Sequence, residues 1–307
     1  MEIQGRILLF FTGIHNGFLN AFTQLITIFG EEWILIGIAV LVYWTVSKKK
    51  GFVYCMCLLN AMTAMDIIKI IVKYPIPWTV IEGLEPVRQH TATGYSFPSG
   101  HTTCASAAYS SLAVGFRKKW LSVVCAIMIA LVALSRMYLC VHWPLDVFGG
   151  LVLGCGVTFL FASVFAKLFD NRAKCISYML RIGTLMTIAA VILVIIVMTG
   201  RADADMHADL TVTLAVHGGF AIGMAVERKL FDFEAEKGSL AIKAGRFALG
   251  LVGVGIFLLG FKELFVIMKI YNPFTRMLRY FLVGLWGGLY PLIGGKLGLF
   301  RGKEKNK

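Results

Sequence analysis

A histidine and an aspartate in this sequence have the spacing of a nucleophile and the residue that orients it. His142 precedes Asp146 by four residues, and side chains four apart meet on one face of a helix. A carboxylate that accepts a hydrogen bond from one ring nitrogen fixes the tautomer of a histidine and leaves the other nitrogen free to attack. Pro144, between them, fits the first turn of a helix. We therefore predict that His142 is a nucleophile oriented by Asp146.

An arginine precedes this pair. Arg136 lies six residues before His142. Its planar guanidinium group is permanently charged, and its N–H donors fit the oxygens of a phosphate group. The alternative is that Arg136 and Asp146 pair with each other and act only as anchors at a membrane surface. Ionisable groups near a membrane interior are costly and usually functional, so phosphate binding is the favoured interpretation.

A second motif, Pro98-Ser99-Gly100-His101, precedes an apolar run. A Ser-Gly pair just before a helix presents free backbone amides, and the helix dipole adds positive potential there. Ser99 and Gly100 are therefore predicted to bind an anion. The alternative is that Ser99 only caps the helix that starts near His101.

The chain that carries these motifs has the composition of an integral membrane protein. Its 307 residues are 58% hydrophobic and 15% charged, with a mean hydropathy of +0.77. Soluble domains are about 45–50% apolar and about 25% charged. The seven cysteines mostly lie inside apolar runs and show no paired spacing of metal ligands. We predict an all-α fold, a polytopic bundle of transmembrane helices.

The apolar runs predict about nine spans, with eight to ten as the range, because a span needs about 20 apolar residues. These runs are residues 31–47, 52–73, 101–117, 119–137, 145–169, 177–199, 208–226, 242–262 and 277–297. Residues 7–29 are apolar but contain His15 and Asn16, so residues 1–30 are predicted as a helix that lies in the interface or spans weakly. We expect residues 31–170 to form the functional membrane core and residues 171–307 to add further helices.

The net charge of +13 is distributed in a way that argues against nucleic acid as a partner. The cations form short groups between apolar runs, as in cytoplasmic loops, although contact with anionic lipid headgroups is compatible with the same pattern. The groups are Lys48 to Lys50, Arg117 to Lys119, Arg172 with Lys174, Arg228 with Lys229, Lys243 with Arg246, and Arg301 to Lys307. This assignment puts the loops 74–100 and 138–144 on the extracytoplasmic side of the cell membrane.

Three sequence blocks together resemble the type-2 phosphatidic acid phosphatase superfamily of integral membrane lipid phosphatases. Its signature is a lysine, six residues and Arg-Pro; then Pro-Ser-Gly-His; then Ser-Arg, five residues, His, three residues and Asp. The second block is complete at residues 98–101 and the third at residues 135–146. In the first block Lys69 and Pro77 match, but Ile76 replaces the arginine.

The resemblance covers about residues 60–170 and implies a core of about six helices with extra C-terminal helices of unassigned role. It implies that Lys69, Arg136 and the amides around Ser99 and Gly100 hold the phosphoryl oxygens. His142 would form a phosphohistidine, and His101 would protonate the leaving oxygen. Arg88 and Lys73 are candidates to replace the missing arginine.

The function implied is hydrolysis of a lipid phosphomonoester or diphosphate at the outer leaflet, without a metal ion or other cofactor. By resemblance, the candidate substrates are undecaprenyl diphosphate, phosphatidic acid and phosphatidylglycerol phosphate. The alternative is a non-hydrolytic protein that binds or transports a lipid phosphate on the same fold. The oriented pair of His142 and Asp146 favours the enzyme, because a binding protein has no use for a nucleophile. The sequence carries no signal for an oligomeric state.

Overall fold

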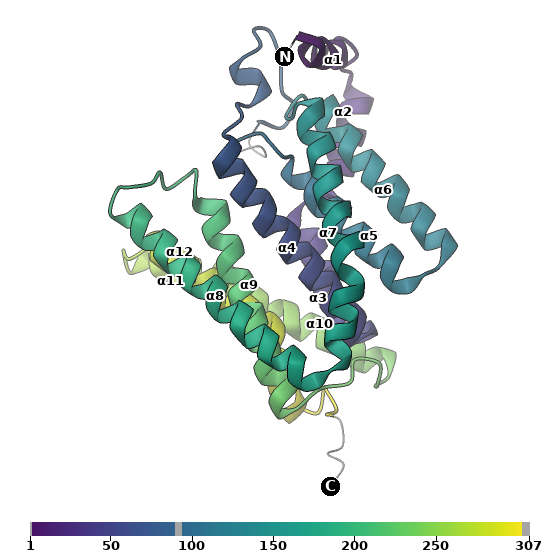
Figure 1. Cartoon of the computed structure of the whole chain (residues 1–307), viewed down its shortest axis with the longest axis vertical. Coiled ribbons are helices and arrows are strands. Elements are labelled where there is room, and N and C mark those ends of the chain that lie inside the picture. Colours follow the sequence, from purple (N-terminus) through teal and green to yellow (C-terminus); the bar gives the residue numbers. More distant parts are fainter. Residues whose placement is uncertain (1, 90–93, 303–307) are drawn as a thin grey trace. The chain divides into compact units, whose positions relative to one another are not determined.

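The computed structural model describes residues 2–89 and 94–302, and the regular elements in these ranges are helices (Figure 1). This confirms the predicted all-α fold. The α-helices are α1 (Glu2–Gly13), α2 (Gly17–Ile28), α3 (Glu32–Leu41), α4 (Lys48–Val72), α5 (Gly100–Phe116), α6 (Lys119–Tyr138), α7 (Pro144–Asp170), α8 (Arg172–Met198), α9 (Ala208–Leu230), α10 (Leu240–Gly255), α11 (Phe261–Ile267) and α12 (Pro273–Lys296). Short π-helical turns follow α3 and α10, at Val42–Val46 and Ile256–Gly260.

Each of the nine predicted spans corresponds to one helical segment of the described chain. By length and composition, six of these segments can cross a membrane. They are α4, α6, α7, α8, α9 and the continuous segment from α10 to α11. The helix α2 and the segment Glu32–Val46 are bent by 43° and would form a seventh span if they cross together.

The N-terminal region differs from the single helix predicted over residues 1–30. It forms α1 and α2, of 12 residues each, because the chain breaks near Asn16, whose side chain accepts a hydrogen bond from the Leu19 amide at 2.9 Å and caps α2. A helix of this length rises about 18 Å, which is too short to cross a hydrocarbon layer of about 30 Å. The helix α2 packs against α6.

The chain divides into two compact units. Unit 1 comprises Met1–Ile38 and Val53–Val164, and unit 2 comprises Ala39–Phe52 and Phe165–Lys307. The N-terminal helices α1 and α2 belong to the same unit as the three sequence blocks.

In unit 1, glycines on α7 allow this helix to approach α5 closely. A Cβ atom at Gly154 would lie 2.4 Å from the Thr103 carbonyl oxygen, and one at Gly150 would lie 3.0 Å from the Ser99 carbonyl oxygen. Backbone atoms of α5 cannot move away as a flexible side chain does, so a side chain at Gly154 would push the two helices apart. The contact brings the first turns of α5 and α7 together.

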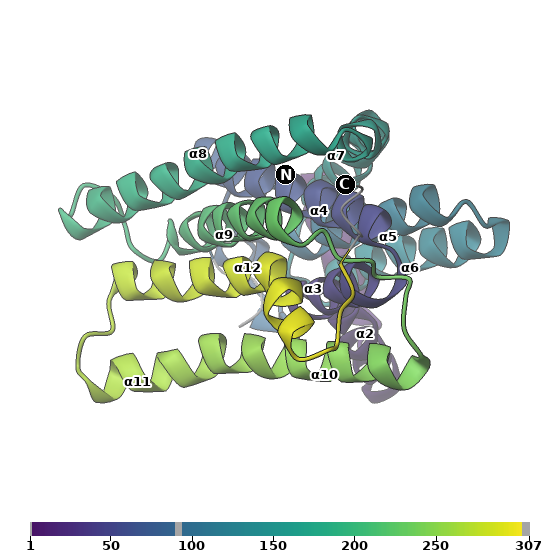
Figure 2. The same cartoon turned by 90° about the horizontal axis from the view of Figure 1, so that it is seen from below.

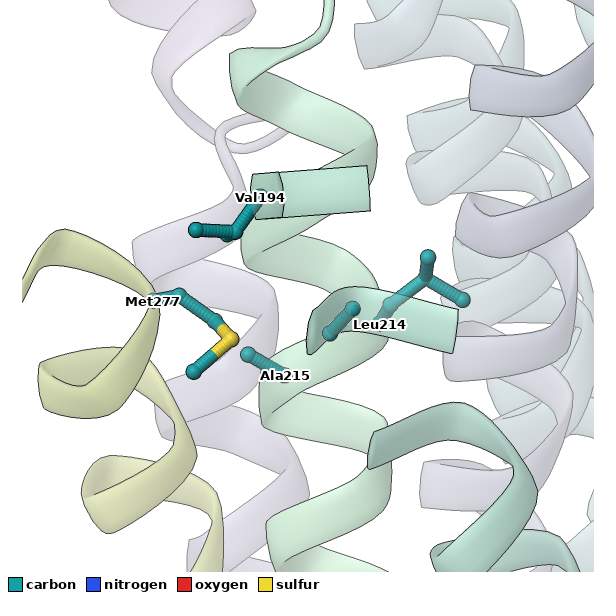
Figure 3. Close-up of a cluster of buried hydrophobic side chains, with 5 residues drawn as sticks. Val194, Leu214, Ala215 and Met277 are labelled. Carbon is teal, nitrogen blue, oxygen red and sulfur yellow. The ribbon is translucent and has the colours of Figure 1, made fainter. Parts of the chain in front are cut away.

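In unit 2, α8, α9, α12 and the segment from α10 to α11 lie side by side in that order (Figure 2). Figure 3 shows part of the core between them, where Val194 of α8, Leu214 and Ala215 of α9 and Met277 of α12 pack together. These side chains are buried, and they hold the C-terminal helices as a bundle of their own.

Unit 2 also buries several of the cations that the sequence places in cytoplasmic loops. Lys48 is 5% exposed, and its Nζ lies 2.7 Å from Glu227 Oε2 and 2.8 Å from Asp232 Oδ1. Arg228 is buried and donates to the Phe169 carbonyl oxygen, and the buried Arg246 donates to the Ala235 carbonyl oxygen. These cations thus help to hold the unit together.

Candidate active site

The predicted site residues lie at the ends of four helices in unit 1. Lys69 is in the last turn of α4, and Gly100 begins α5. Arg136 is in the last turn of α6, and Asp146 is in the first turn of α7. Residues that are far apart in the sequence therefore converge in space.

His142 lies in the short segment between α6 and α7, and its ring faces Asp146. The Nδ1 atom is 3.5 Å from Asp146 Oδ2, which is longer than an ordinary N–H···O hydrogen bond. Asp146 is fully buried, and the same oxygen accepts the Trp143 amide at 2.8 Å. The helix α7 begins at Pro144, as predicted. The structure thus orients Nδ1 toward the carboxylate.

Ser96 is a residue of this site that the sequence does not reveal. Its hydroxyl donates to Asp146 Oδ2 and lies 3.4 Å from His142 Nδ1. The backbone of Ser96 is also fixed, because its amide donates to the Tyr74 carbonyl oxygen at 2.8 Å. A lone serine in a polar loop carries no signal of such a contact.

The surroundings of His142 favour the neutral imidazole. Burial lowers the pKa of His142 to about 4, and the positive charges of Arg136 and Lys69 act in the same direction. The hydrogen bond and charge of Asp146 raise the pKa but do not outweigh burial. A neutral ring at physiological pH retains the lone pair that a nucleophile needs.

The Ser99 amide is already occupied. It donates to the Asp146 carbonyl oxygen at 3.0 Å and so joins the start of α5 to α7. Ser99 takes the N-cap position of α5, but its hydroxyl accepts from Thr102 Oγ1 at 3.0 Å instead of capping an amide. The amides of Gly100 and His101 follow in the first turn, where a helix offers no acceptor.

Lys69 lies beside this helix start. A Cβ atom built on Gly100 would be 3.9 Å from Lys69 Nζ, so the ammonium group is next to the first turn of α5. The first and second sequence blocks therefore meet in space. An ammonium group and a helix N-terminus together suit an anion.

His101 has a buried nitrogen that no other group satisfies in the part of the chain that the structure describes. Its Nε2 atom is inaccessible and lacks a hydrogen-bond partner there. A buried polar atom without a partner costs free energy, which a substrate oxygen or a water molecule can recover. The charges of Arg136, Arg88 and Lys69, and the ring of His142, all act on His101, so these groups surround one region.

Arg136 is fully buried and oriented by the N-terminal region. Its Nη1 donates to Thr27 Oγ1 of α2 at 2.8 Å. Thr27 is itself fully buried, and no motif in the sequence marks it. A threonine in an apolar helix is ordinary, so only the fold reveals that it orients the guanidinium.

Arg88, the candidate for the missing cation, is held in an ion pair. Its Nη2 lies 2.8 Å from Glu31 Oε1, and its Nη1 donates to the Gln24 carbonyl oxygen at 3.3 Å. Ile76 is half-buried and extended, in the loop just before Pro77. Phosphate binding by Arg88 stays a prediction. Within residues 2–89 and 94–302, no three His, Cys, Asp or Glu side chains are grouped to hold a metal ion.

Comparisons with known proteins identify the family of the chain. The PAP2 superfamily profile matches residues 50–170, and the profile of the PAP2 superfamily phosphatase transmembrane extension matches residues 211–304. An undecaprenyl-diphosphatase of Sulfolobus acidocaldarius is 30% identical over 146 residues, which cover 46% of this chain and 68% of the relative. The chain belongs to the PAP2 superfamily. The predicted family is thereby confirmed, and the protein is a PAP2-family membrane phosphatase.

Two further similarities were found. Phosphatidylglycerophosphatase B of Bacillus subtilis is 34% identical over 107 residues, and the match covers 30% of this chain and 50% of that relative. A crystal structure of Aquifex aeolicus LpxE aligns with 50% of this chain and 92% of its own, at 22% identity and a TM-score of 0.45. Of the C-terminal helices, α9 to α12 lie largely within the extension profile, whereas α8 precedes it.

Proposed function

We propose that this PAP2-family membrane phosphatase hydrolyses a lipid phosphomonoester or diphosphate through a phosphohistidine intermediate on His142. The observation that carries the proposal is the orientation of His142, whose Nδ1 is directed to the buried Asp146 and Ser96. This leaves Nε2 as the nucleophile. A protein that only binds or transports lipid phosphates has no need for an imidazole held in this way.

The reaction has two steps. First, His142 Nε2 bonds to phosphorus while the bond between phosphorus and the leaving oxygen breaks, and protonated His101 gives its proton to that oxygen. Second, water attacks phosphorus, the phosphorus–nitrogen bond breaks, and His101 accepts the proton from the water. The products are inorganic phosphate and a lipid alcohol, or inorganic phosphate and a lipid monophosphate if the substrate is a diphosphate.

Charged and polar groups around His101 bind the phosphoryl oxygens in this proposal. Lys69 and Arg136 supply positive charge, and the amides of Gly100 and His101 supply donors at the start of α5. The Ser99 amide does not bind substrate in this proposal, because it donates to the Asp146 carbonyl oxygen and joins α5 to α7. No metal ion takes part. Activity that survives a chelator would support this point, and an absolute requirement for added magnesium would contradict it.

The membrane setting supports a lipid as the substrate. Apolar side chains of the N-terminal helices are exposed, among them Ile3 and Phe18 at 76% and 77%, and would contact lipid. Undecaprenyl diphosphate, phosphatidic acid and phosphatidylglycerol phosphate remain the candidates. The decisive experiment is phosphate release by purified protein from a panel of these lipids with divalent cations chelated. Binding of the lipids without release would favour the alternative of a binding or transport protein.

The active site is proposed to face the extracytoplasmic side, on the basis of the clustering of cations in alternate loops. The exposed residues Glu85 and Lys118, both in unit 1, test this. After substitution by cysteine, Glu85→Cys should react with a membrane-impermeant reagent in intact cells, and Lys118→Cys should be shielded until the cells are opened. The opposite pattern would place catalysis in the cytoplasm.

A further inference from the structure

We propose that Ser96 is a positioning residue whose hydroxyl links His142 Nδ1 to the carboxylate of Asp146. This inference rests on the proposed function, in which His142 is the nucleophile. It goes beyond the three sequence blocks, because Ser96 precedes the second block and has no part in any of them.

The distances support a link through the hydroxyl. His142 Nδ1 lies 3.4 Å from Ser96 Oγ and 3.5 Å from Asp146 Oδ2, so the direct contact between ring and carboxylate is no shorter than the contact with the serine. Ser96 Oγ donates a hydrogen bond to Asp146 Oδ2. Ser96 is 1% exposed and Asp146 is fully buried, so bulk water does not compete for these groups.

Counting donors and acceptors fixes the direction of each hydrogen bond. Asp146 as a carboxylate only accepts, so the single proton of the Ser96 hydroxyl goes to Asp146. The serine oxygen then has lone pairs to accept from His142 Nδ1–H. The proton on Nδ1 stays there throughout the reaction, and Nε2 keeps its lone pair for phosphorus.

This arrangement orients the ring of His142 and also limits how strongly the carboxylate of Asp146 stabilises the imidazolium form. Asp146 Oδ2 receives the Ser96 hydroxyl and the Trp143 amide, and these two donors partly neutralise its charge. A carboxylate with no other donor would hold the imidazolium form more strongly and would reduce the neutral fraction of His142. When the phosphorus–nitrogen bond forms and the ring becomes cationic, the Nδ1–H group still has acceptors beside it.

The rival explanation is that Ser96 only fastens the loop to the rest of unit 1, through its amide bond to the Tyr74 carbonyl oxygen. That role predicts loss of stability and of substrate affinity when the side chain is changed. It predicts no change in the ionisation of His142. The charged or titratable groups that act on His142 are Asp146 of α7, Arg136 of α6, Lys69 of α4 and His101 of α5, and all four remain in a Ser96 variant.

The test compares Ser96→Ala and Ser96→Thr with Ser111→Ala as a matched control. Ser111 is also buried, but its hydroxyl donates to the Ala107 carbonyl oxygen within α5, ten residues further along the chain than His101. Ser96→Ala should lower kcat by roughly tenfold to a hundredfold, the worth of a hydrogen bond to a charged group. It should leave KM within about twofold, since the serine does not touch substrate.

The pH dependence separates positioning from a structural role. In Ser96→Ala the carboxylate loses a donor and pairs directly with the ring, so the acid limb of kcat should move to higher pH by about half a unit or more. Ser96→Thr, which keeps the hydroxyl, should restore most of kcat and the position of the limb. Ser111→Ala should match the wild type in both.

Two results would overturn the proposal. One is a Ser96→Ala variant with wild-type kcat and acid limb. The other is a variant whose melting temperature and KM are altered while its acid limb is unchanged, which would assign Ser96 to holding the loop. Failure of the proposed function looks different, because then the wild-type protein itself would release no phosphate from any lipid tested.

Discussion

The Ser99 amide donates a hydrogen bond to the Asp146 carbonyl oxygen at 3.0 Å. This bond joins the first turn of α5, which carries His101, to the first turn of α7, which carries the residue that orients His142. The geometry of the site therefore depends on how closely these two helices approach each other. Gly150 and Gly154 of α7 allow that approach.

The closeness of α5 and α7 can be tested with two glycines of the same helix. Gly154→Ala would place a Cβ atom 2.4 Å from the Thr103 carbonyl oxygen, whereas a Cβ atom at Gly156 meets nothing within 4 Å. Gly154→Ala should destabilise the protein by about 1–3 kcal/mol and reduce activity, as overpacking does. Gly156→Ala should be neutral or stabilising, because alanine favours a helix by up to about 1 kcal/mol over glycine. Thermal unfolding in detergent and phosphate release measure both, and equal behaviour of the two variants would contradict the packing argument.

The two histidines should fail in different ways when replaced. His142→Ala should abolish phosphate release, because no nucleophile remains, while His101→Ala should slow it strongly and still bind lipid phosphate. Rapid quenching of the wild type should trap acid-labile phosphate on His142. The control is His207→Ala, a histidine of unit 2, which should keep full activity. Undiminished turnover by His142→Ala would exclude the phosphohistidine mechanism.

The sequence predicts the helices well because they depend on local patterns, and it shows the motif blocks directly. A span needs an apolar run of a certain length, and blocks such as residues 98–101 have fixed spacing. The break in the N-terminal region does not follow from the sequence, because a polar pair such as His15 and Asn16 is also compatible with one continuous helix. Asn16 in fact caps a second helix.

Contacts between distant residues could not be predicted from one sequence. Thr27 orients Arg136 across 109 residues, and Ser96 reaches Asp146 across 50. Neither Thr27 nor Ser96 is of a type that stands out in its segment. Lys48 adjoins two other lysines, which predicts a solvent-exposed loop, but its acidic partner Asp232 lies 184 residues away. In such cases only the fold shows which polar groups become buried together.

Adjacent lysines at the start of α4 should contribute very differently to stability. Lys48 is buried against Glu227 and Asp232, whereas Lys49 pairs with Asp170 at the surface, with side chains 42% and 62% exposed. Removing one partner of a buried ion pair leaves an uncompensated charge, so Lys48→Ala should cost about 3–5 kcal/mol. Lys49→Ala should cost about 1 kcal/mol or less. Comparable melting temperatures for the two variants would show that the ion pairs of Lys48 with Glu227 and Asp232 do not stabilise unit 2.

Ile76 stands where the family signature has an arginine, so a positive charge is missing from the first sequence block. Arg88 acts electrostatically on His101, but its guanidinium is also paired with Glu31 at 2.8 Å. If Arg88 supplies the missing charge to the substrate, Arg88→Ala should lower kcat/KM by about tenfold or more, the worth of a charge-assisted hydrogen bond of about 1.5–3 kcal/mol. Ile76→Arg in that background should recover part of the loss, because both changes act on one phosphate group.

Kinetics on the wild type, the two single variants and the double variant decide the matter, since coupling between the sites appears as non-additive free energies. Glu31→Gln is the matched control, because it removes the ion pair and keeps Arg88. If Arg88 serves only to pair with Glu31, Glu31→Gln should reduce stability and activity as much as Arg88→Ala does, and Ile76→Arg should rescue neither. If Arg88 binds substrate, Glu31→Gln should retain or raise the affinity for lipid phosphate, because the guanidinium is then freed from a competing carboxylate. A neutral Arg88→Ala together with an inert Ile76→Arg would mean that Lys69 and Arg136 suffice for the phosphate.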